Sequence, residues 1–338
     1  MQPAGTDNQS KKTQNLYLDQ NFLVICAVSL IAVLGVSSVT PAFPKLAQAL
    51  NVNPKNIGLL VTAFTLPTLF LGPIIGVLAD RLGRKKIIVP SLLLFGIAGT
   101  ACAFARDFNL LLLLRLLQGI GAASLLSLSV TLIGDLYAGD KRANAMGYNA
   151  SITSIGTAIY PTIGGALATI GWYYPFGLPI AAIPIGLLVL FCLKNPEPQG
   201  ERNLQEYLRN AGKVLKNRQL AGLFIASAAN FILLYGAYVT YLPQLINDTF
   251  KAPPATIGLL LSSVSVAVTI TSSQLGRLAR RFAATTLIRA SFVFYALALF
   301  IIPFVPEYLA IINPNHDFWN WSWYRFSEYP NTLSRVGT

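Results

Sequence analysis

The sequence predicts an all-α integral membrane protein, a bundle of transmembrane helices. Of its 338 residues, 54% are hydrophobic and 11% are charged, and the mean hydropathy is +0.57, whereas soluble domains are about 25% charged. Apolar stretches of about 20 residues, the length that crosses a bilayer, recur along the chain. These observations exclude an ordinary soluble enzyme, a disordered chain and, despite a net charge of +12, a typical nucleic-acid-binding protein.

Nine stretches are long and apolar enough to be expected as transmembrane spans. They cover residues 22–42, 57–79, 87–105, 109–134, 145–170, 174–193, 221–246, 256–279 and 287–305. Several contain glycine or proline, which membrane helices tolerate because neighbouring helices satisfy the freed backbone groups. The connections are mostly short, so consecutive spans are expected to be antiparallel.

The distribution of basic residues predicts the orientation of these spans. The leader and every second connection together carry 17 lysines and arginines, whereas the alternate connections carry four. Because cytoplasmic loops are enriched in basic residues, we expect a cytoplasmic N-terminus in a plasma (inner) membrane. The first span is long and follows a polar leader, which is atypical of a cleavable signal peptide.

The longest connection divides the spans into six and three. We therefore expect a cytoplasmic leader (1–21), an N-terminal six-helix bundle (22–193), a cytoplasmic linker (194–220), a partial C-terminal bundle (221–305) and an aberrant tail (306–338). The linker is charged and weakly amphipathic, as in a helix lying on a membrane surface.

No sequence pattern indicates a cofactor, a metal site or an enzyme. Cys26, Cys102 and Cys192 lie in apolar runs without metal-ligand spacing, so neither a disulfide framework nor a metal site is expected. The chain has one histidine, and it lacks a phosphate-binding G-x-x-x-x-G-K-[ST] loop, an H-E-x-x-H motif and a G-x-S-x-G motif.

The connection after the second span reads Gly76-Val77-Leu78-Ala79-Asp80-Arg81-Leu82-Gly83-Arg84-Lys85-Lys86. It resembles the signature loop of the major facilitator superfamily, specifically its drug:proton antiporter-like multidrug efflux branch. The resemblance extends over residues 15–305 and implies two parallel six-helix halves.

In this family the loop acts as a conformational latch. The resemblance assigns this role to Gly76, Asp80, Arg81, Gly83, Arg84, Asp135 and Arg142. Gly76 and Gly83 allow a close helix approach and a tight turn. Asp80 can pair with Arg84 or with a helix dipole. Alternatively, the basic residues only set the topology.

The fourth span contains a basic residue, Arg115, followed by Gln118-Gly119-Ile120-Gly121. This resembles a second family motif, whose arginine is associated with proton coupling, so Arg115 and Gln118 are the coupling candidates. A charge inside a membrane is costly and is functional by default. The alternative is a structural arginine bonded to helix carbonyls.

The fifth span resembles the antiporter motif G-x-x-x-G-P-x-x-G-G. Gly156, Pro161, Gly164 and Gly165 match, and Tyr160 replaces the second glycine. In the family this motif separates exporters from importers, so the resemblance favours export.

The family usually has twelve spans, and this chain has nine. A segment beginning at Gly276 resembles the loop beginning at Gly76, as expected for repeated halves, but the apolar pattern ends after Pro306. Three tryptophans follow, and back-translation in an adjacent frame gives an apolar, glycine-rich span. We hypothesise that a frameshift ended the chain early.

The function implied by these resemblances is secondary active export of a small drug-like or metabolite solute by proton antiport, through alternating access. Two alternatives stay open: a non-transporting truncated remnant, and an uptake or facilitator member of the same superfamily. No span interior contains Asp or Glu. Coupling therefore rests on Asp80, Asp135 and Arg115, or on helices that this chain lacks, or it is absent.

Polar and aromatic residues inside spans are the candidates for a substrate cavity. They are Ser38, Asn149, Asn230, Tyr235 and Tyr238. Each could instead seal a contact between helices, and their neutral character suits an apolar or cationic solute. The expected partners are this small-molecule substrate, protons and the lipid bilayer, and not nucleic acid; the sequence does not give the oligomeric state.

Overall fold

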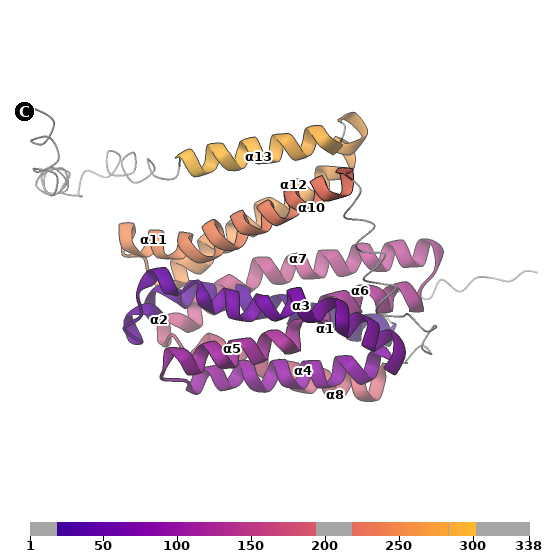
Figure 1. Ribbon diagram of the computed structural model, residues 1–338, viewed down its shortest axis with the longest axis horizontal. Coiled ribbons are helices and arrows are strands. Elements are labelled where there is room, and N and C mark those ends of the chain that lie inside the picture. The colour runs from indigo at the N-terminus through magenta and orange to yellow at the C-terminus, as the bar shows by residue number, and fades with distance from the viewer. Residues whose placement is uncertain (1–18, 194–217, 283, 302–338) are drawn as a thin grey trace, which may run out of the picture. The chain divides into compact units, whose positions relative to one another are not determined.

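The computed structural model describes residues 19–193, 218–282 and 284–301, and every regular element in these ranges is helical. The chain divides into two compact units, Met1–Thr269 and Ile270–Thr338. The first unit contains most of the helices labelled in Figure 1. Most of the predicted leader (1–18), nearly all of the linker (194–217) and the predicted aberrant tail lie outside the described residues.

The first spans follow the prediction closely. Helix α1 (Gln20–Ser37) begins where the carboxylate of Asp19 accepts a hydrogen bond from the backbone N–H of Asn21, 2.9 Å away. A short turn, η2 (Thr40–Ala42), and helix α2 (Phe43–Ala49) follow it. The turn η3 (Pro54–Asn56) leads into helix α3 (Leu59–Leu82).

A glycine separates α3 from α4 (Arg84–Ala101). Gly83 has φ +95°, a conformation that side chains disfavour. The two helices therefore meet in a one-residue turn that places Arg84 at the start of α4, next to the end of α3. The turn η4 (Cys102–Phe104) ends this segment.

The fourth predicted span is one apolar segment, Phe108–Leu136, in which the helix is interrupted once. Helix α5 (Phe108–Ala122) is capped by Asp107, and α6 (Leu125–Leu136) begins after a break at Ala123 and Ser124. The hydroxyl of Ser124 donates to that of Ser91 at 3.2 Å. Apolarity continues through the break, which explains why hydropathy alone predicts one span.

Helix α7 (Gly139–Ile170) is continuous over 32 residues and contains Pro161. The last predicted span of the N-terminal bundle begins as a 3₁₀-helix, η5 (Tyr174–Ala181), and continues as α8 (Ala182–Cys192).

The seventh predicted span contains a change of helix type. Helix α10 (Arg218–Ile232) passes into a π-helix, η6 (Leu233–Tyr241), and then into α11 (Leu242–Phe250). Helix α12 (Pro254–Arg281) follows and crosses from the first unit into the second. The second unit also contains α13 (Ala284–Ile301).

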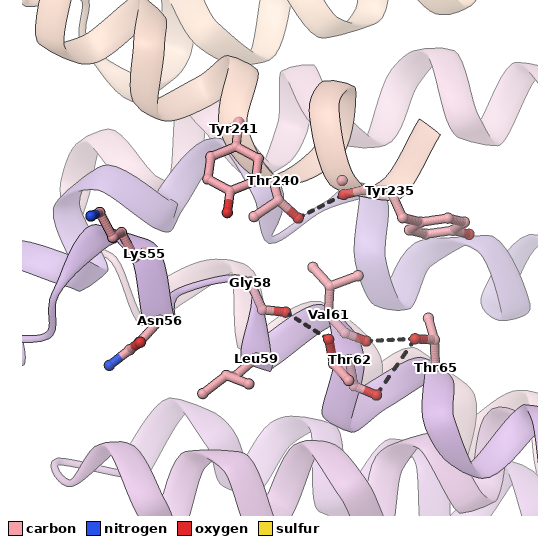
Figure 2. Close-up of a pocket in the computed structure, with 11 residues that line it drawn as sticks. Lys55, Asn56, Gly58, Leu59, Val61, Thr62, Thr65, Tyr235, Thr240 and Tyr241 are labelled. Atoms are coloured by element: carbon pink, nitrogen blue, oxygen red, sulfur yellow. Dashed lines mark hydrogen bonds between the residues drawn. The ribbon is translucent and has the colours of Figure 1, made fainter. Parts of the chain in front are cut away.

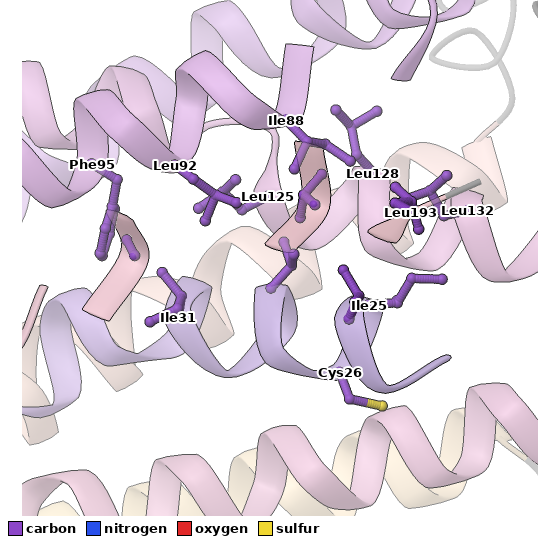
Figure 3. Packing of buried hydrophobic residues seen from close by; sticks show 14 of the residues in the cluster. Ile25, Cys26, Ile31, Ile88, Leu92, Phe95, Leu125, Leu128, Leu132 and Leu193 are labelled. Carbon is purple, nitrogen blue, oxygen red and sulfur yellow. The ribbon is translucent and has the colours of Figure 1, made fainter. Parts of the chain in front are cut away.

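Helix α1 lies at the centre of the main apolar core. Ile25 and Ile31 of α1 face Leu92 and Phe95 of α4 and Leu128 of α6 (Figure 3). All five side chains are buried. A second cluster, just beyond the C-terminal end of α1, includes Val39 and residues of α2, α3, α5 and η5. Because lipid is as apolar as these side chains, close packing is what favours this arrangement.

Many large apolar side chains face outward, as a membrane requires. Phe70, Phe104 and Phe191 are 64%, 76% and 78% exposed, which is an unusual number of exposed rings for a water-soluble surface. In the described residues, six helical segments are long and apolar enough to cross a membrane, and two shorter apolar helices (Pro254–Ile270 and Thr286–Leu297) follow. Helix α7 is not one of the six.

Candidate functional site

Arg84 joins three helix ends through two carboxylates. Its Nη2 atom donates to Oδ1 of Asp80, 3.0 Å away at the end of α3, and its Nε lies 2.6 Å from Oδ2 of Asp135, at the end of α6. The three side chains are only 12–21% exposed, so solvent screens these ion pairs less than it screens surface pairs. This is the pairing that the sequence resemblance implies.

The other predicted latch residues have separate positions. Gly83 supplies the positive φ of the turn, as expected. Arg142 is exposed and its guanidinium lies beside Gly134, and Arg81 is exposed without an ion pair to any described residue. A Cβ added at Gly76 would meet no described atom within 4 Å, so the close approach expected there is not seen in the described part of the chain.

Arg115 is completely buried in α5 and contacts α1. Its Nη1 atom donates to the carbonyl oxygen of Gly35 at 2.8 Å and to Oε1 of Gln118 at 2.9 Å. The guanidinium lies over the ring of Phe64, 4.8 Å from its centroid, and 5.8 Å from that of Phe176. Aromatic faces and a carbonyl therefore stabilise the charge.

Some hydrogen-bond donors of Arg115 are not used in the contacts described above. Its Nε and Nη2 atoms and the Nε2 of Gln118 are buried without a hydrogen-bond partner in the described part of the chain. No carboxylate in the described ranges pairs with Arg115. Such donors can hold a water or a small anion. The bond to Gly35 is what a structural arginine makes, and it leaves the coupling role untested.

The antiporter-motif residues of α7 lie at two helix contacts. A Cβ at Gly156 would come within 2.9 Å of Leu30 and 3.2 Å of Tyr160, and one at Gly164 would overlap the carbonyl of Ser38. Gly156 and Gly164 therefore allow α7 to approach α1 closely.

The neighbouring glycine of α7 faces α12 instead. A Cβ at Gly165 would overlap the carbonyl oxygen of Pro254, and one at Gly258 would overlap that of Pro161. The hydroxyl of Thr162 donates to that of Ser262 at 2.7 Å in the same contact. Two reciprocal glycines and one hydrogen bond thus join a helix of the predicted N-terminal bundle to one of the predicted C-terminal bundle.

The predicted cavity residues do not gather at one site. The hydroxyl of Ser38 donates to Leu34 of its own helix, and that of Tyr238 donates to the carbonyl of Leu261. Asn149 is buried on α7, and its Oδ1 atom accepts no hydrogen bond from the residues that the structure describes. Asn230 lies on α10 and is partly buried. Tyr235 lines a cavity between η6 and the start of α3 (Figure 2).

Sequence reasoning missed three of the residues that form these contacts. Ser262 and Gly258 meet α7, and Lys55 lines the cavity with Tyr235. Their partners lie about 100 or more residues away in the sequence, so no local spacing could have identified them. Among the described residues, no cluster of histidine, cysteine or acidic side chains could hold a metal ion.

Comparison with known proteins identifies similar chains. The sequence pattern of the Major Facilitator Superfamily matches residues 25–322. The Bacillibactin exporter of Bacillus subtilis (strain 168) is 29% identical over 254 residues, which cover 72% of this chain and 63% of that protein. Multidrug resistance protein 2 of the same strain is 26% identical over 298 residues, covering 86% and 74%. Quinolone resistance protein NorA of Staphylococcus aureus (strain MRSA252) is 30% identical over 215 residues, covering 62% and 55%.

These alignments span only part of the relatives, from about half to three quarters of their length. Solved structures show the fold. A bacterial homolog of the human lysosomal transporter Spinster, inward-facing and unoccupied, superposes with a TM-score of 0.63 at 19% identity, covering 78% of this chain and 62% of that one. The nucleoside transporter NupG gives 0.65 at 14% identity, covering 77% and 68%.

Proposed function

The chain belongs to the Major Facilitator Superfamily, and from this premise we propose that it is a secondary active transporter that exports a small drug-like or metabolite solute. The drive is proton antiport, and the mechanism is alternating access. The names of the relatives, an exporter and two resistance proteins, support export over uptake.

The proposed mechanism is supported chiefly by two contacts that lie at opposite ends of the helices: the Arg84 ion pairs and the contact between α7 and α12. The Arg84 ion pairs lie at the end of α3 and α6, and the α7–α12 contact lies near the other end of α7. In the proposed cycle the α7–α12 contact opens while the cluster at Arg84 rearranges. Because glycine contacts and one hydroxyl pair hold the α7–α12 crossing, it can separate without exposing a buried charge.

Coupling is proposed to involve Arg115, Gln118, Asp80 and Asp135. An arginine stays protonated in proteins, so Arg115 acts by holding an acceptor rather than by losing a proton. Its unpartnered Nε and Nη2 atoms leave room for one. Asp80 and Asp135 take part through the ion pairs that they form with Arg84.

The test uses the purified full chain in liposomes with an imposed pH gradient. With an acidic lumen, an antiporter accumulates a fluorescent quinolone or ethidium, and a protonophore abolishes the accumulation. Arg115→Ala and Asp80→Asn are expected to lose it. An uptake symporter accumulates solute only with the gradient reversed, a facilitator equilibrates solute without accumulation, and a remnant shows no saturable flux.

A further inference from the structure

A cavity of about 360 Å³ lies between the start of α3 and the π-helix η6. Lys55 and Thr62 line it from the η3–α3 side, and Tyr235, Thr240 and Tyr241 line it from η6 (Figure 2). It is at the opposite end of α3 from Asp80 and is separate from the Arg84 and Arg115 sites. Its volume is near the lower limit of ligand pockets and fits a two-ring molecule.

The charge that lines this cavity is positive. Among the described residues, Lys55 is the only charged one that lines it; its side chain is exposed and forms no ion pair with any of them. The threonine hydroxyls donate to backbone carbonyls: Thr62 to Gly58 at 3.3 Å and Thr240 to Tyr235 at 2.7 Å. Because no carboxylate of the described segments lines the cavity, none of these residues balances the charge of a cationic ligand.

The π-helix places two aromatic rings at this cavity. Tyr235 stacks on Phe231 with centroids 5.0 Å apart and planes at 20°, and Tyr241 is 56% exposed. The wider turn of a π-helix brings residues five apart together, as in the bond from Thr240 to Tyr235. Short π-helical segments occur frequently at functional sites.

We infer that this cavity is a binding site for aromatic carboxylates. The carboxylate binds the ammonium of Lys55, and the rings contact Tyr235 and Tyr241. The site prefers an anion to a neutral or cationic analogue of the same shape, contrary to the apolar or cationic solute that the sequence suggests. The inference deepens the proposed export function by naming the substrate class, and it rests on that function only for the step after binding.

The experiment measures binding at equilibrium, without a gradient. Purified full-length chain in detergent is dialysed against 2-naphthoate, 2-naphthamide or 2-naphthylmethylammonium, and protein-free micelles correct for partition. We expect 2-naphthoate to bind about tenfold more tightly than the amide, the size of one charge-assisted contact, and the ammonium to bind most weakly. Lys55→Gln should remove the preference and Lys55→Arg should keep it.

Lys45→Gln is the matched control. Lys45 does not line the cavity, and its ammonium donates to the carbonyl of Thr169 at 2.9 Å, so this variant should bind as the unmodified chain does. Equal affinities, tighter binding of the ammonium, a preference that survives Lys55→Gln, or no binding of any probe would each overturn the inference. If the chain binds 2-naphthoate in a Lys55-dependent way but does not transport solute, the proposed function is contradicted and the binding site is not.

Discussion

Arg84 at the start of α4 is held by Asp135 at the end of α6, with Nε and Oδ2 2.6 Å apart. The two residues are 51 positions apart in the sequence, and the one-residue turn at Gly83 brings Arg84 between Asp135 and Asp80. The guanidinium thus has a carboxylate on each side. A charge placed in this way can hold three helix ends in one state of a transport cycle.

Asp135→Asn should destabilise the chain by about 1–3 kcal/mol, because it leaves a mostly buried guanidinium with one charged partner instead of two. Thermal unfolding in detergent measures this, and transport should fall with it. Asp140→Asn is the control, since Asp140 is exposed in the first turn of α7 and makes no ion pair with a described residue. Both are measured in about 0.5 M salt, which screens exposed charges. Equal losses would contradict the role of the Arg84–Asp135 pair.

Gly164→Ala should destabilise the chain strongly, by about 2 kcal/mol or more, because the new Cβ would overlap the backbone carbonyl of Ser38 and force α7 away from α1. The readout is the midpoint of thermal unfolding. Gly147→Ala on the same helix is the matched control: it meets no described atom within 4 Å and should be neutral or stabilising by up to about 1 kcal/mol. A similar loss in both variants would refute close packing as the cause.

Thr162 and Ser262 should show a coupling energy of about 0.5–1.5 kcal/mol in a double-mutant cycle of Thr162→Val and Ser262→Ala, because each hydroxyl is the other's partner across the α7–α12 contact. Unfolding midpoints of the four chains give this coupling. Thr169→Val combined with Ser262→Ala should be additive, since the hydroxyl of Thr169 donates to Gly165 of its own helix. Additivity in the first cycle would mean that the two hydroxyls do not interact.

Arg115→Lys should keep the fold and lose gradient-driven accumulation. A lysine keeps the charge and can donate to Gly35, but it lacks the Nε and Nη2 donors that are proposed to hold the acceptor. The measurements are the unfolding midpoint and accumulation in liposomes with an acidic lumen. Arg106→Lys, at an exposed arginine near the rings of Trp172 and Tyr173, should change neither. Full accumulation by Arg115→Lys would leave Arg115 a structural role only.

The sequence predicts the helical class and most helix positions because a span of apolar residues is a local property. Hydropathy does not show the break at Ala123 and Ser124, because the apolar stretch continues through it. It also does not show the π-helix η6, which lies within a continuous apolar stretch. Both features depend on contacts with other helices.

The candidate site is predictable where a motif specifies it. The resemblance identifies Asp80, Arg84 and Asp135, and the structure brings these residues together. The cavity at Lys55 was not predictable, because its two sides lie about 180 residues apart and neither side has a motif. The roles of the predicted residues in transport stay predictions.

The distribution of basic residues predicts the orientation of the spans in the membrane, which can be tested by labelling. Lys141 lies in a connection of the basic-rich set and Lys251 in one of the alternate set, and both side chains are exposed. In a background with the three native cysteines replaced by alanine, Lys251→Cys should react with a membrane-impermeant maleimide in intact cells. Lys141→Cys should react only after permeabilisation, because basic loops stay in the cytoplasm. The reverse pattern would place the basic loops outside and contradict the predicted cytoplasmic N-terminus.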